Sequence, residues 1–499
     1  MSGKVTLIGA GPNDLGLLTV KALDELKQAE VVIYDRLVGK DILDLIPENA
    51  EKIDAGKKSS NHKIPQSEIN ELLLQKALDG KKVVRLKGGD CFLFGRGAEE
   101  LELLADNNIE FQVIPGVSSA FSVPAYAGIP ITHRDFVSSV HIITGHQKEN
   151  EPLKINFKSC VECAGTLIFL MGVSNIREIM NGLIINGMNP NMPCAIIENG
   201  TTSKQRKIIG NISNIEMLSI KENIKSPAII VVGEVCNFSD KFDWFSKLPL
   251  KNKTIAVTRP KDRNRSFLQK LKNLGAEVIE FPCIKTKSLI NSYLLENIIN
   301  KINSYNVIVF TSPTGVKFVF DKLFENKIDG RIFFGKKIAV IGSATFEELK
   351  KYGLFADYMP KTFDGKSLGK LISENEKDKK ILLLRAKDAS SEIIEQFEKY
   401  NINYLDLPIY YTEFLANENE KFQKQIIEGK VDFITFTSAS TVKGFVSNIQ
   451  NGYDKFTGIC IGEKTNEQAL KFGIKTIMSK KASIDEMINT ILKEVKKCQ

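Results

Sequence analysis

The 499-residue sequence contains no run of eighteen apolar residues, and we therefore expect no membrane-spanning helix. Its first residues lead directly into a predicted strand, so no signal peptide is expected either. The eight cysteines are scattered along the chain, which is typical of a reduced, cytoplasmic protein rather than a disulfide framework. One pair, Cys160 and Cys163, has CxxC spacing, but a second pair and nearby histidines are lacking, so no metal is predicted.

Dense basic runs are also absent, although the formal net charge is +8. Nucleic acid and membrane surfaces are therefore not expected as partners, and an acidic small molecule is favoured. A solvated basic surface without any partner remains an alternative. The chain is too long to fold around a single hydrophobic core, and its length therefore indicates two to four domains. A polar stretch at 237–253, which holds the only tryptophan, Trp244, is the best candidate for a linker.

Two glycine-rich loops, Leu7–Asp14 and Leu86–Gly97, each follow a predicted buried strand in the first half. Strands here alternate with amphipathic helices, which predicts an α/β fold. Small ligands bind at the carboxyl edge of such sheets, where glycine allows the backbone to approach them. A dinucleotide site is the alternative, but Asp14 stands where that fingerprint needs a small residue, and Pro12 lies inside the loop.

The second half contains an internal repeat. Val309–Val316 resembles Thr435–Val442, and Ile341–Thr345 resembles Ile461–Thr465. Each segment places hydroxyl residues at a predicted turn from strand to helix, where they can cap the helix and leave N–H groups facing an anion. Plain helix capping would explain any one of these turns. Four turns from two similar lobes predict a cleft lined by anion-binding helix ends.

Residues 3 to about 240 resemble the uroporphyrinogen-III C-methyltransferase family. The resemblance covers this half almost continuously and in order. Its motifs are Leu7–Asp14, Val31–Leu37, Ala55–Lys57, Ile64–Asn70, Arg85–Asp90, Phe94–Gly97, Val113–Val117, Ala127–Asp135, Leu170–Gly172 and Ile197–Thr201. The resemblance implies that uroporphyrinogen III is methylated twice, at C2 and C7, with S-adenosylmethionine to give precorrin-2. It also implies a homodimer through this half.

The same resemblance implies roles for individual residues. Asp35 stands at the family's proton acceptor and Lys57 at its proton donor, and His133 lies in a motif of the substrate pocket. Helix capping by Asp35 and a solvated Lys57 are the plainer alternatives. The implied S-adenosylmethionine contacts are Pro12, Gly88, Gly89, Asp90, Leu93, Ser118, Ser119, Met171 and Gly200. The chain departs from the family at Asn13 (usually Gly), Cys91 (usually Pro), Ser118–Ser119 (usually Thr-Ala) and Lys58 (usually Arg).

Residues from about 252 to the end resemble the uroporphyrinogen-III synthase family. The motifs are Ala256–Pro260, the four turns of the repeat and Leu407–Thr412. The resemblance implies closure of hydroxymethylbilane to uroporphyrinogen III with inversion of ring D, without a cofactor. Tyr410 would assist loss of the hydroxyl group, although it is equally interpretable as a strand-packing aromatic. The implied carboxylate-binding residues are Ser312, Thr345, Ser438 and Thr465.

Together these features predict an α/β chain with two domains: a two-lobed tetrapyrrole methylase at 1–240, and a two-lobed synthase with parallel sheets at 252–499. The resemblance implies that the synthase lobes comprise 252–285 with 412–499, and 286–411. The alternative is a methyltransferase fused to a ligand-sensing module without catalytic activity. A complete sirohaem synthase is disfavoured because a GxGxxG unit is lacking. Whether precorrin-2 continues to sirohaem or cobalamin stays open.

Overall fold

The computed structural model describes residues 3–56, 64–146, 153–260, 264–416 and 420–497. The chain divides into two compact units. The first comprises Met1–Asn252 with Lys272–Glu277, and the second comprises Lys253–Leu271 with Val278–Gln499.

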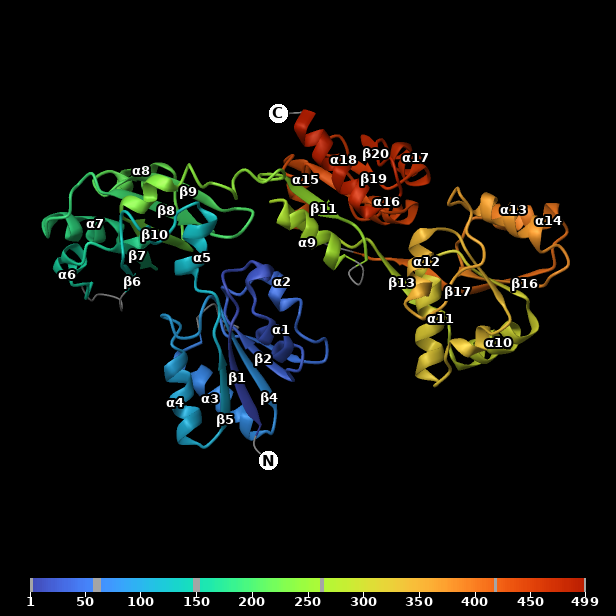
Figure 1. Ribbon diagram of the computed structural model, residues 1–499, viewed down its shortest axis with the longest axis horizontal. Helices are drawn as coiled ribbons and strands as arrows, with labels where there is room; N and C mark the ends of the chain where they lie inside the picture. Colours follow the sequence, from blue (N-terminus) through green and yellow to red (C-terminus); the bar gives the residue numbers. More distant parts are fainter. Residues whose placement is uncertain (1–2, 57–63, 147–152, 261–263, 417–419, 498–499) are drawn as a thin grey trace. The chain divides into compact units, whose positions relative to one another are not determined.

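The first sheet of the first unit is parallel, with the strand order β3-β2-β4-β1-β5. Its inner strand β1 (Lys4–Gly9) is mostly apolar and almost wholly buried, as expected of a parallel sheet with both faces covered. Figure 1 shows the helices that connect and cover these strands. The remaining elements are α1 (Val20–Leu26), β2 (Val31–Tyr34), α2 (Lys40–Leu43), β3 (Glu51–Asp54), α3 (Gln66–Leu78), β4 (Lys82–Lys87), α4 (Gly97–Asp106) and β5 (Glu110–Ile114).

The second sheet of this unit has the strand order β6-β7-β10-β8-β9. Only β6 and β7 pair in parallel, and the other neighbours are antiparallel. Its elements are α5 (Ser119–Tyr126), β6 (Val140–Thr144), α6 (Phe157–Glu162), β7 (Thr166–Leu170), α7 (Ile176–Ile185), β8 (Pro193–Glu198), β9 (Arg206–Asn211), α8 (Ile215–Lys221) and β10 (Ala228–Val232).

The stretch 237–253 differs from the linker that its polar composition predicts. The indole Nε1 of Trp244 donates to the carbonyl of Ala125 at 3.1 Å, and the ring lies edge-on to Tyr126 with 4.9 Å between centroids. Asp243 pairs with Lys207 at 3.0 Å. These aromatic and ionic contacts hold the segment on the first unit, which the composition of the stretch did not reveal.

The second unit contains two further sheets, with strand orders β12-β11-β18-β19-β20 and β13-β17-β16-β14-β15. Parallel pairing dominates, and β13 against β17 is antiparallel. The strands are β11 (Thr254–Val257), β12 (Glu277–Glu280), β13 (Ile284–Ser288), β14 (Val307–Phe310), β15 (Lys337–Val340), β16 (Ile381–Ala386), β17 (Tyr404–Phe414), β18 (Phe433–Phe436), β19 (Thr457–Cys460) and β20 (Thr476–Met478). The α/β fold class with parallel-dominated sheets is thus confirmed.

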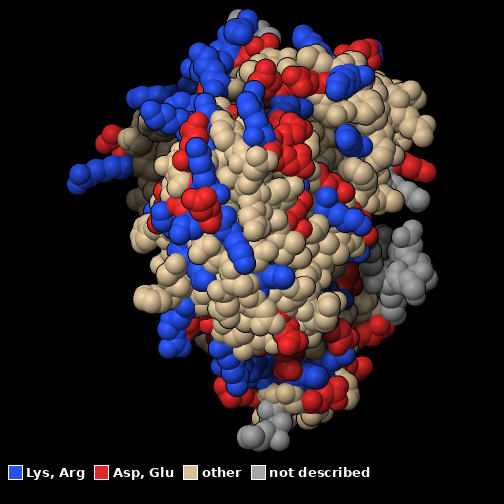
Figure 2. Space-filling model, turned by 90° about the vertical axis from the view of Figure 1, so that its right-hand side faces the viewer, with Lys and Arg blue, Asp and Glu red and all other residues tan. Residues whose placement is uncertain are grey.

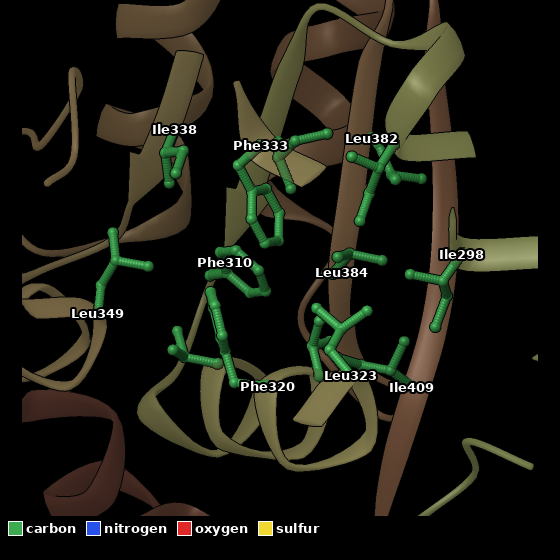
Figure 3. Packing of buried hydrophobic residues seen from close by; sticks show 14 of the residues in the cluster. Ile298, Phe310, Phe320, Leu323, Phe333, Ile338, Leu349, Leu382, Leu384 and Ile409 are labelled. Atoms are coloured by element: carbon green, nitrogen blue, oxygen red, sulfur yellow. The ribbon is translucent and has the colours of Figure 1, made fainter. Parts of the chain in front are cut away.

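The sequence repeat corresponds to a repeated structural unit. Strand β14 leads into α11 and pairs with β15, which leads into α12; β18, α16, β19 and α17 repeat this arrangement. Figure 3 shows the core beneath the first copy, where Phe310, Phe320 and Phe333 pack together. The helices of the unit are α9 (Arg265–Asn273), α10 (Ser292–Ser304), α11 (Pro313–Glu325), α12 (Ser343–Lys350), α13 (Gly365–Asn375), α14 (Glu392–Lys399), α15 (Glu420–Ile427), α16 (Ala439–Val446), α17 (Glu463–Lys471) and α18 (Ile484–Lys497).

Charged side chains of opposite sign are interspersed on the face drawn in Figure 2. Short ion pairs along single helices, such as Lys322 with Glu325 at 2.6 Å, illustrate the same mixture. Within the described ranges, none of the helices combines the length and apolar character that a membrane crossing requires.

Candidate active sites

Three glycine-containing loops converge where β1, β4 and β5 end. Gly11 and Gly89 exchange two backbone hydrogen bonds, of 3.1 and 2.9 Å. A Cβ on Gly9 would lie 2.4 Å from the nitrogen of Gly116, and one on Gly116 would lie 2.2 Å from the oxygen of Gly89. Side chains at these positions would force the loops apart. The glycines therefore close the carboxyl edge of the sheet into one continuous backbone surface.

Within this surface, Gly89 and Asp90 have different functions. Gly89 has a φ of +71°, and a Cβ there would meet nothing within 4 Å, so its exposed side is open for a ligand. Asp90 instead orders the loop. Its Oδ1 accepts from the nitrogens of Phe92 and Leu93 at 2.9 and 3.0 Å, and its Oδ2 accepts from Gly116 at 3.2 Å.

Two hydrogen bonds connect the first loop to residues of the second sheet and its helices, and we call them the latch. The hydroxyl of Tyr126 donates to Asp14 Oδ2 at 2.7 Å, and the hydroxyl of Thr201 donates to the carbonyl of Pro12. Between Pro12 and Asp14, Asn13 adopts a φ of +78°. Asparagine tolerates this left-handed conformation better than most residues, so it preserves the turn at a position where the family has glycine.

The remaining expected cofactor contacts lie at strand ends and at the start of α5. Ser118 caps α5 by accepting from the nitrogen of Ala120 at 3.2 Å, and Ser119 is the first residue of that helix. Met171 directly follows β7 with a φ of +55°, and its side chain is exposed. A Cβ on Gly200 would lie 2.4 Å from Val123 of α5, so this position requires glycine.

Leu93 connects the expected cofactor residues of the loop after β4 with those beside α5, because it packs on the apolar cluster that contains Ala120 and Val123. Gly88 is placed beside the segment that follows β2, since a Cβ there would lie 3.0 Å from Leu37. The structure therefore brings the expected cofactor residues from both sheets to one region of the first unit. Their contact with S-adenosylmethionine stays a prediction.

Asp35 lies directly after β2, and its backbone nitrogen donates to the carbonyl of Leu86 on β4 at 3.1 Å. Its Oδ1 accepts a 2.6 Å hydrogen bond from Nη2 of Arg85. Sequence reasoning did not single out this arginine, although a charged residue between the apolar positions of β4 was the available signal. Lys57, the expected proton donor, lies outside the described residues.

His133 lies in an aromatic cluster. Its ring stacks on Phe238 with 4.8 Å between centroids and meets the edge of Phe136 at 4.9 Å. Nδ1 of the ring accepts a hydrogen bond from the nitrogen of Asp135 at 3.2 Å. These contacts fix the ring, and its place in a substrate pocket stays a prediction.

The buried cysteines of the described segments have thiol pKa values that burial raises, which is not the environment of a reactive site. Cys91, in place of the family's proline, is fully buried, and burial raises the pKa of its thiol to about 12. A thiol with this pKa stays protonated and unreactive at neutral pH. Among the residues that the structure describes, no cluster of three or more His, Cys, Asp or Glu side chains could hold a metal.

In the second unit, the structure joins two residues that the sequence singled out separately. The hydroxyl of Tyr410, on β17, lies 2.7 Å from Oγ of Ser312, the N-cap of α11. The side chain of Tyr410 is 7% exposed and belongs to the apolar core of that lobe. The tyrosine therefore packs in the core while its hydroxyl reaches a polar helix end.

The four helix starts of the repeat are of two kinds. Ser312 caps α11 by accepting from the nitrogen of Gly315 at 3.1 Å, and Ser438 caps α16 in a reciprocal pair with Thr441. Helices α12 and α17 instead begin after glycines that offer no side-chain cap, and Thr345 and Thr465 lie nearly buried in their first turns. Among the described residues, the first N–H groups of α12 and α17 have no capping side chain, and such helix starts can bind an anion.

Comparison with known proteins assigns each half of the chain to a protein family. The model of tetrapyrrole (corrin/porphyrin) methylases matches residues 4–216, and that of uroporphyrinogen-III synthase HemD matches residues 265–489. The porphyrin biosynthesis protein HemD of Ruminiclostridium josui is 46% identical over 492 residues, which cover 98% of either chain. Siroheme synthase 2 of Yersinia enterocolitica is 49% identical over 244 residues, and the chain spans 51% of that relative's length.

Two solved structures from Thermus thermophilus are similar to separate parts of the chain. Uroporphyrin-III C-methyl transferase complexed with S-adenyl homocysteine is 36% identical, covering 47% of this chain and 99% of its own, with a TM-score of 0.41. A mutant uroporphyrinogen III synthase is 14% identical, covering 50% of this chain and 100% of its own, with a TM-score of 0.39.

Both resemblances stated from the sequence are confirmed by the family models and by the full-length relative. The chain belongs to the family of porphyrin biosynthesis proteins in which a tetrapyrrole methylase domain is followed by a uroporphyrinogen-III synthase domain.

Proposed function

We propose that this enzyme performs two consecutive steps of tetrapyrrole synthesis. The second domain closes hydroxymethylbilane to uroporphyrinogen III with inversion of ring D. The first domain then methylates uroporphyrinogen III at C2 and C7 with S-adenosylmethionine to give precorrin-2. The observation that carries the proposal is the carboxylate of Asp35, which arginine holds beside the strand ends where the glycine loops converge.

The glycine surface suits S-adenosylmethionine because Gly89 offers an open backbone and the loops approach too closely for side chains. The sulfonium supplies an already activated methyl group, so the main task of the protein is alignment. After the methyl group bonds to a ring carbon, the substrate must lose a proton. The carboxylate of Asp35 is the base that we assign to this step. Lys57, by resemblance, returns a proton.

In the second domain, the proposed substrate must lose its hydroxyl as water to give a cationic azafulvene. We assign the assisting proton to Tyr410, whose hydroxyl is oriented by Ser312. The carboxylates of the substrate would bind at the starts of α12 and α17, beside Thr345 and Thr465, because these helices lack capping side chains. The hydroxyls of Ser312 and Ser438 already cap their own helices and would contribute less to binding.

The test supplies hydroxymethylbilane to the full chain with and without S-adenosylmethionine and identifies the products by chromatography. We expect uroporphyrinogen III without the methyl donor and precorrin-2 with it. Uroporphyrinogen I alone, the product of uncatalysed closure, would indicate that the second domain is a ligand-sensing module. Uroporphyrinogen III that is never methylated would contradict the first-domain assignment.

We further propose that the methylase domain spans 1–240 and the synthase domain 252–499, with the lobes expected from the sequence. A homodimer through the methylase domain and a cytoplasmic location complete the proposal. Light scattering of the full chain tests the dimer, because a mass near one 55.7 kDa chain would exclude it.

A further inference from the structure

Four charged side chains form a connected group beneath the first-domain site. Arg85 and Lys87 stand two residues apart on β4 and therefore point to the same face of the sheet. Oε1 of Glu100, on α4, accepts from Nε of Arg85 at 3.1 Å, from Nζ of Lys87 at 2.7 Å and from Nε2 of Gln66 at 3.0 Å. Nη2 of Arg85 continues the connection to Asp35. We call these four charged residues the buried quartet.

Burial of the quartet ends at Asp35. The side chains of Arg85, Lys87 and Glu100 are 2%, 3% and 0% exposed, whereas that of Asp35 is 34% exposed. Two cations and two anions balance each other, which limits the large cost of buried charge. Apolar side chains of similar volume would often stabilise a fold as well as such ion pairs do. Stability is therefore a weak explanation for the quartet, and its one exposed member, Asp35, lies directly after β2 at the strand ends.

The guanidinium of Arg85 is fixed in orientation by every arm of its fork. Nη1 contacts the carbonyls of Ile33 and Leu86, each at 3.4 Å, while Nε and Nη2 are bound to the two carboxylates. Only Oδ1 of Asp35 is bound to this fork. Among the described residues, Oδ2 of Asp35 has no hydrogen-bond partner. A rigid, planar donor thus holds one oxygen of a partly exposed carboxylate and leaves the other unbound by this fork.

We propose that Arg85 is a positioning residue for methylation, and that Glu100 orients Arg85 so that Oδ2 of Asp35 faces the substrate. Lys87 supplies the second cation of the quartet without reaching Asp35. This inference rests on the proposed function, because Asp35 must be the base. A misplaced base slows a reaction by up to about a hundredfold without weakening substrate binding.

Two charge-balanced double variants of the full chain test the proposal. Arg85→Met/Glu100→Gln removes one buried cation and one buried anion and leaves Asp35 without its partner. Lys87→Met/Glu100→Gln removes the same charges but leaves Arg85 on Asp35, and the introduced glutamine still offers an oxygen to Nε of Arg85. We expect kcat for methylation to fall about tenfold to a hundredfold in the first. In the second, kcat should fall clearly less than in the first, because Arg85 keeps its bond to Asp35 and an amide oxygen replaces the carboxylate that orients it, and KM should change little in both.

A double-mutant cycle separates positioning from a structural effect. In an Asp35→Asn background, the Arg85→Met/Glu100→Gln change should have no further effect on kcat, because it acts through Asp35. Equal losses of kcat in both double variants, or an undiminished loss in the Asp35→Asn background, would overturn the proposal. Thermal melting and S-adenosylhomocysteine binding establish that each variant is folded.

If the Arg85→Met/Glu100→Gln variant does not fold, the single variant Arg85→Lys tests the positioning role of Arg85 instead. A lysine keeps the buried charge but cannot bind Asp35 and Glu100 through separate arms, so kcat should fall while KM stays unchanged. Wild-type kcat in this variant would contradict the proposal. An inactive wild-type chain, or an Asp35→Asn variant with normal methylation, would instead contradict the proposed function itself.

Discussion

At the scale of single residues, the environment of each side chain decides which of two plausible roles it takes. Asp90 looks like a ligand-binding carboxylate in the sequence, yet its oxygens accept three backbone N–H groups of adjoining loops. Asp35 has a single side-chain partner among the described residues, Arg85, and retains solvent exposure. A carboxylate with one partner keeps an oxygen available to a ligand, whereas one that accepts several N–H groups holds a loop.

Replacing Asp35 with asparagine should therefore separate chemistry from binding. Asp35→Asn keeps the shape of the side chain and an oxygen for Arg85, but it removes the carboxylate that we propose as the base. We expect methylation to fall by about 10²-fold or more, while calorimetric binding of S-adenosylhomocysteine stays near that of the wild type. Asp24→Asn, on α1, is the matched control and should leave both unchanged. Normal precorrin-2 formation by Asp35→Asn would return Asp35 to a structural role.

In the second domain, the hydroxyl of Tyr410 is the group to which we assign proton transfer, as we assign it to Asp35 in the first. Tyr410→Phe keeps the ring in the core and removes only the hydroxyl, so folding should be retained. We expect less uroporphyrinogen III relative to isomer I, because loss of the substrate hydroxyl loses its assisting proton. Ser312→Ala should cause a smaller loss, since it removes an orienting contact of about 0.5–1.5 kcal/mol.

Methylation of supplied uroporphyrinogen III serves as the internal control for both variants and should stay unchanged. The experiment measures the ratio of isomers III and I by chromatography. A wild-type ratio in Tyr410→Phe combined with a large loss in Ser312→Ala would show that the serine, and not the tyrosine, carries the chemistry.

At the scale of elements, the helix starts of the second domain differ in whether a side chain caps them, and a strand-end loop of the first domain is held by side-chain hydrogen bonds. In the second domain, α11 and α16 cap themselves with serine, whereas α12 and α17 begin after glycine and lack a capping side chain. In the first domain, the latch ties the loop after β1 to Tyr126 and Thr201. The latch holds this loop together with the two backbone hydrogen bonds between Gly11 and Gly89.

Breaking the latch should weaken cofactor binding more than it weakens the fold. Burial and the hydrogen bond to Asp14 raise the pKa of Tyr126, so its hydroxyl stays a donor well into the alkaline range. Tyr126→Phe removes a hydrogen bond to a charged group, worth about 1.5–3 kcal/mol. We expect the calorimetric Kd for S-adenosylhomocysteine to rise by about tenfold, with a smaller rise in Thr201→Val.

Tyr453→Phe offers a matched control in the second domain, because it also removes a tyrosine hydroxyl that is hydrogen-bonded, here to Ile449. Its Kd for S-adenosylhomocysteine should equal that of the wild type. An unchanged Kd in both Tyr126→Phe and Thr201→Val would show that the loop keeps its position without the latch.

At the scale of the whole molecule, two compact units with separate sheets and cores share one chain. We expect the pieces 1–252 and 253–499 to fold and keep their own activities when the chain is divided between Asn252 and Lys253, a cut that removes only Lys272–Glu277 from the first unit. This position leaves Trp244 and its contacts with the first unit. Circular dichroism and separate assays of the two reactions provide the measurement. A second piece that dissolves only in the presence of the first would contradict independent folding.

The sequence by itself determined the fold class, the repeat and the identity of both domains. Apolar strands that end in glycine, and hydroxyl residues at strand-to-helix turns, are local patterns that report local structure directly. The left-handed turn at Asn13 was also foreseeable, because it depends on one residue's own backbone preference.

Only the tertiary structure decided which distant groups meet. Arg85 and Glu100 are separated by a strand end, a loop and a helix turn, and neither belongs to a pattern that pairs them. The contacts of Tyr126 with Asp14 and of Tyr410 with Ser312 join segments about a hundred residues apart. Local propensity carries no information about such pairs, since they form when sheets and helices pack and buried polar groups must find partners.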